Sequence, residues 1–219
     1  MNKSAERRHS SGLSEHSDIG ILTSIVNSVT GGKAASRTAE LMMREFGDLQ
    51  GVLAAGTKEL TLRHNIPAEV IAEIERLKYL LQAILRRQLC NRPLLEDLKT
   101  VESYFRSKLI DNRKEQFHAL FLDKAFKLLA EECLQTGTLD HVTVYPREVL
   151  YSAIECRATH IILIHNHPAG NSIPSKMDIT VTRDLISAVS YFGIHIADHI
   201  VIGQDGAFSF REHNLLAFR

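Results

Sequence analysis

The segment Ile161-Ile162-Leu163-Ile164-His165-Asn166-His167-Pro168-Ala169-Gly170, continued by Pro174-Ser175-Lys176-Met177-Asp178, joins an apolar run to a polar loop. The run His160–Ile164 is nearly all apolar, which is typical of a strand covered on both faces of a sheet. Gly170 and Pro174 indicate a loop, and the sequence from about Ser175 to Phe192 favours a helix that ends at Gly193. The segment therefore predicts a buried strand, a loop and a helix in succession.

Three polar side chains of this segment have the types and spacing of metal ligands. His165 and His167 lie two positions apart in an extended segment, so their imidazoles project from one face. Asp178 can supply a carboxylate as the third ligand. Two histidines and a carboxylate, with one position left open, are typical of a catalytic Zn²⁺ site, where the ion lowers the pKa of a bound water to about 7. Ser175 would donate a hydrogen bond to the developing oxyanion.

Each part of this pattern also has a structural explanation. Ser175 followed by Asp178 is close to a capping box, in which a serine begins a helix and an acidic residue three positions later completes the cap. A histidine pair alone is weak support, since most such residues belong to a core or a surface. The joint occurrence at the end of a buried strand favours the metal centre.

The rest of the C-terminal part alternates short strands with helices. Pro146 suits the first turn of a helix whose apolar face includes Val149 and Ile154. This alternation indicates an α+β domain. Strands are predicted over Phe117–Leu122, His141–Tyr145, Ile194–Ile202 and Ala207–Phe210.

From Asp18 to about Phe105 the apolar residues recur at helical spacing. The longest such stretch, Pro67–Leu89, carries one broad apolar stripe that includes Val70 and Ile84. We therefore predict a mobile N-terminus over 1–14, an all-helical region over 15–105 and a metal-binding domain over 106–219.

The composition of the chain limits the partners and the cellular location that we expect. Lys+Arg and Asp+Glu both number 26, so the net charge gives no general attraction to nucleic acid or to an anionic membrane. The chain contains neither an apolar run of the ~20 residues that a membrane span needs nor the apolar core of a signal peptide. The three cysteines form no CxxC pair. A cytoplasmic protein without a membrane partner is the expectation.

The ligand pattern resembles the signature of the JAMM (MPN-plus) metalloproteases, His-x-His, seven residues, Ser, two residues, Asp, with His165, His167, Ser175 and Asp178 in the four places. Within that superfamily the chain resembles the bacterial RadC family, although Ala169 stands where serine is usual. This resemblance implies a cytidine-deaminase-like α/β/α sandwich with a mixed central sheet, and a zinc-dependent hydrolase of peptide or isopeptide bonds. Further RadC-like phrases are Phe121-Leu122-Asp123, Gly137-Thr138, Tyr145-Pro146-Arg147-Glu148 and Asp198-His199-Ile200-Val201-Ile202-Gly203.

The resemblance also implies a glutamate that is not a ligand but accepts a proton from the attacking water and passes it to the leaving amine. In JAMM proteins it precedes the first strand of the domain, which makes Glu115 the first choice here. Glu148 is the alternative general base and Glu132 the third choice.

Two further regions leave alternatives open. His195 and His199 lie at i and i+4 in a predicted strand, so they would share a face and could form a second metal cluster with Asp198, although satisfied core or edge histidines are more common. RadC proteins also carry a helix-hairpin-helix-like segment that binds DNA. The corresponding place, Leu60–Val70, lacks both hairpin glycines, and Pro67 removes an amide donor.

Three functions therefore compete. The first is a zinc hydrolase with a peptide or protein substrate. The second is a DNA-associated accessory protein in repair or recombination, which the missing glycines disfavour. The third is a metal-binding interaction module without turnover. The sequence does not indicate an oligomeric state.

Overall fold

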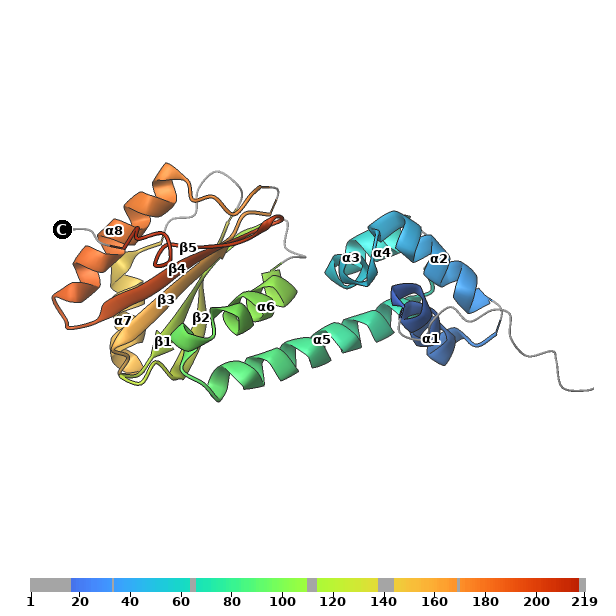
Figure 1. The fold of residues 1–219 in the computed structure, drawn as a ribbon, viewed down its shortest axis with the longest axis horizontal. Coiled ribbons are helices and arrows are strands. Elements are labelled where there is room, and N and C mark those ends of the chain that lie inside the picture. The colour runs from blue at the N-terminus through green and yellow to red at the C-terminus, as the bar shows by residue number, and fades with distance from the viewer. Residues whose placement is uncertain are drawn as a thin grey trace, which may run out of the picture. The chain divides into compact units, whose positions relative to one another are not determined.

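The computed structural model describes residues 17–32, 34–63, 66–109, 114–137, 144–168 and 170–216 (Figure 1). The chain forms two compact units, the first ending at Leu80 and the second beginning at Leu81. This boundary lies inside a helix, whereas the sequence predicted a domain boundary between residues 105 and 106. The predicted mobile segment 1–14 lies outside the described residues.

The first unit is entirely helical over its described residues. Ser17 begins the first helix by accepting a hydrogen bond from the backbone N–H of Gly20, and Asp48 caps the third helix in the same way. Leu22, Val26 and Met42 are buried in the core between the helices. The helices are α1 (Asp18–Thr30), α2 (Ala34–Phe46), α3 (Leu49–Ala54), α4 (Thr57–Arg63) and the first part of α5 (Ala68–Cys90).

The apolar residues predicted to form one stripe along α5 pack into two separate hydrophobic cores. Val70 and Ile74 pack in the first unit, and Leu89 packs in the second. Leu80 and Ile84, which the sequence placed on the same stripe, are exposed. Residues 64 and 65 of the hairpin-like segment lie outside the described residues.

The second unit contains a five-stranded mixed sheet in the order β2-β1-β3-β4-β5. The pair β3–β4 is parallel and the other pairs are antiparallel. The elements are the end of α5, η1 (Leu94–Glu96), α6 (Leu98–Leu109), β1 (Glu115–Leu122), β2 (Leu128–Gly137), α7 (Pro146–Glu155), β3 (His160–Asn166), α8 (Lys176–Ser190), β4 (His195–Gly203) and β5 (Gly206–Ser209).

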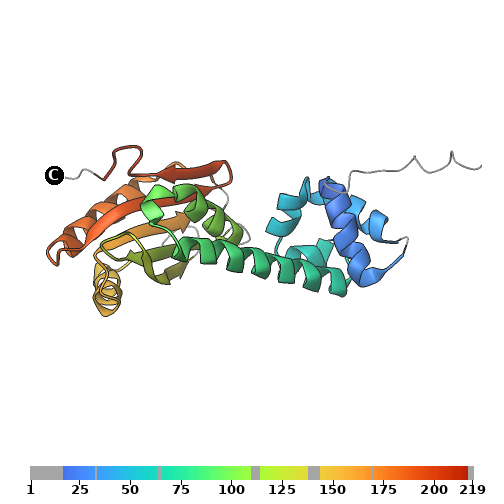
Figure 2. The same ribbon diagram turned by 60° about the horizontal axis from the view of Figure 1, so that its bottom comes forward.

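Helices cover both faces of this sheet (Figures 1 and 2). On one face α7 and α8 pack against alternate residues of the strands, such as Phe117 and Leu163. On the other face α6 and the end of α5 pack against the intervening residues, such as Leu120 and Ile164. The predicted α+β fold, a mixed sheet between helices after a helical N-terminal region, is confirmed.

Several details differ from the prediction. The edge strand β2 was missed, because its glutamates and partly exposed positions give no clear apolar alternation. Ile154 was expected in the core but is exposed on α7. The predicted strand His141–Tyr145 lies mainly outside the described residues, and its last residue Tyr145 is the N-cap of α7. No described helix has the length and apolar character that crossing a membrane requires.

Candidate metal centre

Four side chains that could bind a metal ion converge at one end of the central strands. They are Glu115 at the start of β1, His165 at the end of β3, His167 in the following loop and Asp178 in the first turn of α8. One potential ligand atom of each lies within 4.8 Å of those of the others. Antiparallel pairing of β1 with β3 sets Phe117 opposite His165, so the beginning of one strand meets the end of the other.

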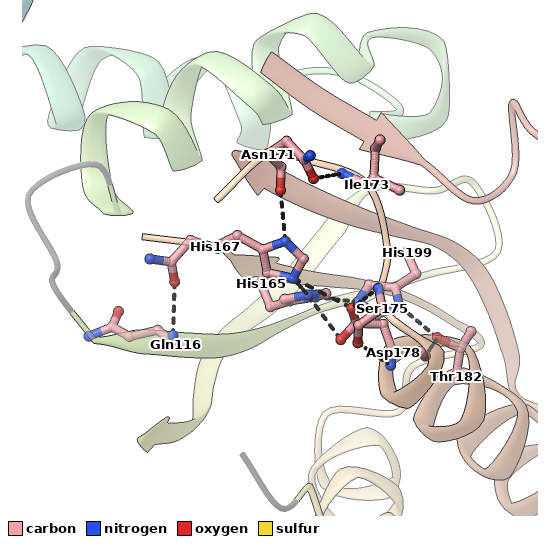
Figure 3. A network of polar contacts seen from close by, with 10 residues as sticks. Gln116, His165, His167, Asn171, Ile173, Ser175, Asp178, Thr182 and His199 are labelled. Carbon is pink, nitrogen blue, oxygen red and sulfur yellow. Dashed lines mark hydrogen bonds and ion pairs between the residues drawn. The ribbon is translucent and has the colours of Figure 1, made fainter. Parts of the chain in front are cut away.

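The three predicted ligands have the spacing that a tetrahedral ion requires. His165 Nε2 and His167 Nε2 are 3.0 Å apart. Asp178 Oδ1 lies 3.2 Å from His165 Nε2, and Asp178 Oδ2 lies 3.4 Å from His167 Nε2 (Figure 3). Metal–ligand bonds of about 2.0–2.1 Å place tetrahedral ligands about 3.3 Å from one another. These residues therefore fit a divalent cation such as Zn²⁺ in both donor type and spacing.

A loop carbonyl fixes the ring of His167. Its Nδ1 lies 2.8 Å from the backbone oxygen of Asn171, and because a carbonyl oxygen only accepts, the imidazole donates the proton from Nδ1. The Nε2 atom that faces His165 and Asp178 is then left without a proton in the neutral ring. Such an outer hydrogen bond orients a histidine ligand and selects its tautomer.

The loop that supplies this carbonyl is held by the turn between β4 and β5. Asp205 accepts a hydrogen bond from the Ser172 N–H, and Gln204 donates from its backbone and its side chain to the carbonyls of Gly170 and Pro168. Gly203 permits the close approach, because a Cβ there would lie 2.3 Å from the Ser172 nitrogen. The β4–β5 turn thus sets the position of the loop.

Ser175 and Asp178 form a complete capping box. The Ser175 hydroxyl oxygen accepts from the Asp178 N–H at 3.2 Å, and Asp178 Oδ2 accepts from the Ser175 N–H at 2.6 Å. The structural explanation and the functional one are compatible here. The cap holds the carboxylate toward the histidines, and the Ser175 hydroxyl keeps its own proton free to donate.

Glu115 is half-buried, and the burial raises the pKa of its carboxyl group. His165 and His167 lower this pKa, whereas Asp178 raises it. The side chain of Asn166 bridges the two backbone groups that flank Glu115. It accepts from the Gln116 N–H at 2.8 Å and donates to the Lys114 carbonyl at 3.3 Å. This clamp fixes the backbone that carries the glutamate.

The RadC-like JAB domain family model matches residues 95–215, which is more than half of the chain. The chain belongs to this family. The match covers β1 to β5 and therefore all four residues of the candidate metal centre.

The electrostatics of this RadC-like centre favour an ionised aspartate. Burial raises the pKa of Asp178, but hydrogen bonds from His165 and His167, when their Nε2 atoms carry a proton, outweigh burial and hold the pKa well below its usual range. The Asp178 carboxylate in turn raises the pKa of His167, because a second proton on Nε2 would donate to it, against the opposite effect of burial. The aspartate is a carboxylate at neutral pH, as a metal ligand must be.

The other two glutamates considered from the sequence are not among the four converging residues of the RadC-like domain. The side chain of Glu148 is 61% exposed and forms an ion pair with Arg147 on α7. Glu132 lies in β2, where it pairs with Ala119 in the middle of β1 rather than at its beginning. Glu115 alone of the three lies beside the histidines and Asp178.

The predicted shared face of His195 and His199 is wrong. Ala197 is an extra residue in β4, because Ile161 pairs with Ile196 and Ile162 pairs with Asp198. This bulge reverses the alternation of side chains, so His195 is exposed while His199 is fully buried beside His165. His199 is a satisfied core histidine, and these residues form no second cluster within the described part of the chain.

Thr182 and Asn166 carry no role that the sequence pattern predicted. Thr182 lies one helical turn after Asp178 and shares its face, so helical spacing could have suggested it. Its hydroxyl lies 2.6 Å from His199 Nδ1 (Figure 3). Asn166 follows His165 in β3, so the alternation of a strand turns its side chain away from that of His165, and its amide bonds to the backbone at the start of β1.

Proposed function

We propose that this chain is a zinc-dependent hydrolase that cleaves a peptide or isopeptide amide bond by activating water. The observation that carries the proposal is the convergence of two Nε2 atoms and a carboxylate at tetrahedral spacing beside a half-buried glutamate. Membership of the RadC-like JAB family supports the same chemistry.

His165, His167 and Asp178 would hold the ion, and two neutral imidazoles with one carboxylate suit Zn²⁺ and leave a coordination position open. When bound, Zn²⁺ supplies a Lewis acid and lowers the pKa of water to about 7.

The remaining steps belong to residues beside the ligands. Glu115 accepts the proton of the attacking water and then donates it to the leaving nitrogen, and the burial that raises its pKa favours its holding the proton between these two steps. Ser175 donates its hydroxyl proton to the substrate carbonyl oxygen as negative charge develops. Asn166 keeps Glu115 in place through the backbone on either side.

The ligand assignment is tested by metal analysis of purified protein. We expect the wild type to bind about one Zn²⁺ per chain, and His165→Ala, His167→Ala and Asp178→Asn each to bind far less, because each removes one of three protein ligands. Inductively coupled plasma mass spectrometry measures the stoichiometry. An unchanged zinc content in all three variants would contradict the assignment.

The general base is tested by separating metal content from turnover. Glu115→Gln should keep its zinc and lose hydrolysis by a factor of about 10²–10⁴. Glu148→Gln is the matched control, because that side chain is exposed and is not among the four converging residues, and we expect it to retain activity. Turnover is measured as new amines released from a mixture of linear and isopeptide-linked peptides.

Other outcomes point to the competing functions. Activity retained in Glu115→Gln and lost in Glu148→Gln would move the role to Glu148. A zinc-loaded protein without turnover on any amide would favour the interaction module. A salt-dependent affinity for DNA at physiological ionic strength would favour the accessory protein.

A further inference from the structure

His199 makes a fully buried contact with the proposed ligand His165. Its ring is fully buried, stacks on Phe210 at 4.6 Å between centroids, and lies 5.4 Å from the ring of Phe117. Both of its nitrogens have partners. Nε2 is 2.8 Å from His165 Nδ1, and Nδ1 is 2.6 Å from the hydroxyl oxygen of Thr182 (Figure 3).

These groups form a row of hydrogen bonds that runs from the Asp178 carbonyl through Thr182 and His199 to His165. The direction of each hydrogen bond follows from the Asp178 end of this row. The Thr182 hydroxyl lies 2.5 Å from the backbone oxygen of Asp178, which can only accept, so the hydroxyl donates there. Thr182 then accepts the proton that His199 carries on Nδ1. A neutral imidazole has one N–H, so Nε2 of His199 is an acceptor, and the proton between the two rings belongs to Nδ1 of His165.

We propose that His199 and Thr182 are positioning residues that hold His165 in the tautomer with its proton on Nδ1, so that the Nε2 lone pair faces the divalent cation. The inference rests on the proposed function, because it gives a purpose to a buried imidazole that is not a ligand. The row begins at the backbone of Asp178 and ends at His165, so it links two proposed ligands through groups that never touch the ion.

The same geometry explains why His167 needs no comparable row. The Asn171 carbonyl can only accept, so a single backbone group suffices to place the proton of His167 on Nδ1. At His165 the neighbouring group is another imidazole, which could either give or take a proton. A second group that can only accept, the Asp178 carbonyl, is therefore needed to fix the direction of the hydrogen bond between the two rings. Thr182 connects this carbonyl to His199.

The test compares variants that keep the packing but change the hydrogen bonds. Thr182→Val removes the hydroxyl at nearly constant volume, and Thr182→Ser restores it. His199→Phe keeps an aromatic ring between Phe210 and Phe117, whereas His199→Gln offers an amide oxygen to His165. The dissociation constant for Zn²⁺ is measured by competition with a chromogenic chelator, on proteins whose fold is checked by circular dichroism.

We expect Thr182→Val and His199→Phe to bind Zn²⁺ about 10–100-fold more weakly than the wild type, with Thr182→Ser close to the wild type and His199→Gln intermediate. In zinc-loaded ¹⁵N-labelled wild type, Nδ1 of His165 should carry a slowly exchanging proton, and this proton should exchange faster in both weakened variants. A merely structural role would lower the stability of the metal-free protein and leave the zinc affinity unchanged.

Wild-type zinc affinity in both Thr182→Val and a folded His199→Phe would overturn the inference. If His199→Phe does not fold, the comparison of Thr182→Val with Thr182→Ser decides the test. Equal zinc affinities of these two variants would contradict the proposed role of the hydrogen-bonded row. A wild type that binds no divalent ion would overturn this inference and the proposed function together. A wild type that binds zinc but cleaves no amide would contradict the proposed hydrolase activity. The positioning role would then be decided by the zinc affinities of the variants alone.

Discussion

His118 in β1 is a buried imidazole on the sheet face opposite the candidate metal centre. Its ring lies 5.4 Å from that of Phe105 on α6, and its Nε2 is 3.0 Å from Gln116 Oε1. Nδ1 has no hydrogen-bond partner among the residues that the structure describes. Burial lowers the pKa of His118 to about 4, so the ring is neutral in the folded protein at physiological pH.

This residue should make stability depend on pH. Between the ordinary histidine pKa of 6.5 and about 4, the unfolded chain binds a proton that the folded chain does not, so stability falls as the pH falls through this window. The full loss is on the order of 3 kcal/mol. Chemical denaturation of wild type and His118→Leu at pH 7 and pH 4.5 measures it.

The comparison isolates one group, because the histidines of the metal centre remain in both proteins. We expect the difference in unfolding free energy between the two proteins to shift in favour of His118→Leu on acidification. Parallel pH dependences of the two proteins would show that folding does not lower the pKa of His118.

At the level of elements, the junction of β4 with its turn positions the loop that carries His167. The backbone of Asn171 and Ser172 passes so close to Gly203 that no side chain fits between them. The Asn171 carbonyl is also the acceptor that orients His167. A substitution in this turn, which contains no proposed ligand, should therefore change the affinity of the candidate centre for a metal ion.

We expect Gly203→Ala to weaken Zn²⁺ binding by about tenfold or more, because the methyl group displaces the acceptor of the His167 proton. Gly206→Ala in the same turn is the control, since a Cβ there meets no atom within 4 Å, although its positive φ adds some strain. Titration with a chelator measures both. Equal affinities of the two variants would show that the loop moves without disturbing His167.

The elements and residues that were predicted correctly are those whose sequence signals lie close together along the chain. The strand β3, its loop and α8 follow one another, so apolar runs, turn residues and caps indicate them directly. The proposed ligands lie in that same stretch. Glu115 lies on another strand, and only the resemblance to JAMM proteins pointed to it.

The missed features depend on pairing between strands, which spacing along the chain does not reveal. The clamp by Asn166 needs the register of β1 against β3. The contact of His199 with His165 needs the bulge in β4, which a simple alternation of side chains cannot anticipate. The edge strand β2 was missed because its exposed side carries polar groups that resemble those of a loop.

At the level of the whole molecule, α5 contributes to two hydrophobic cores. Its last part belongs to the second unit, where Leu89 is fully buried and Gln82 donates a hydrogen bond to the Ser107 carbonyl at 2.9 Å. The family match begins only at residue 95. The matched region therefore lacks a helix segment that covers one face of its own sheet.

A fragment comprising residues 81–219 should fold and bind Zn²⁺ as the full chain does, whereas a fragment comprising 95–219 should be markedly less stable. The shorter fragment loses Leu89 and Leu94, which are both buried, and each buried leucine contributes about 1.5–3 kcal/mol. We expect a loss of at least about 3 kcal/mol in the free energy of unfolding, measured by urea denaturation. Equal stability of the two fragments would show that α5 is dispensable for the second unit.

The bulge at Ala197 makes the centre sensitive to the number of residues in β4 as well as to their identity. Deleting one residue there would require either Ile196 to leave the core or His199 to turn away from His165, although every amino acid named in the motif would still be present. In a relative of this chain, a single-residue gap at this point would therefore be expected to separate His199 from His165 even where the residues of the candidate metal centre are unchanged.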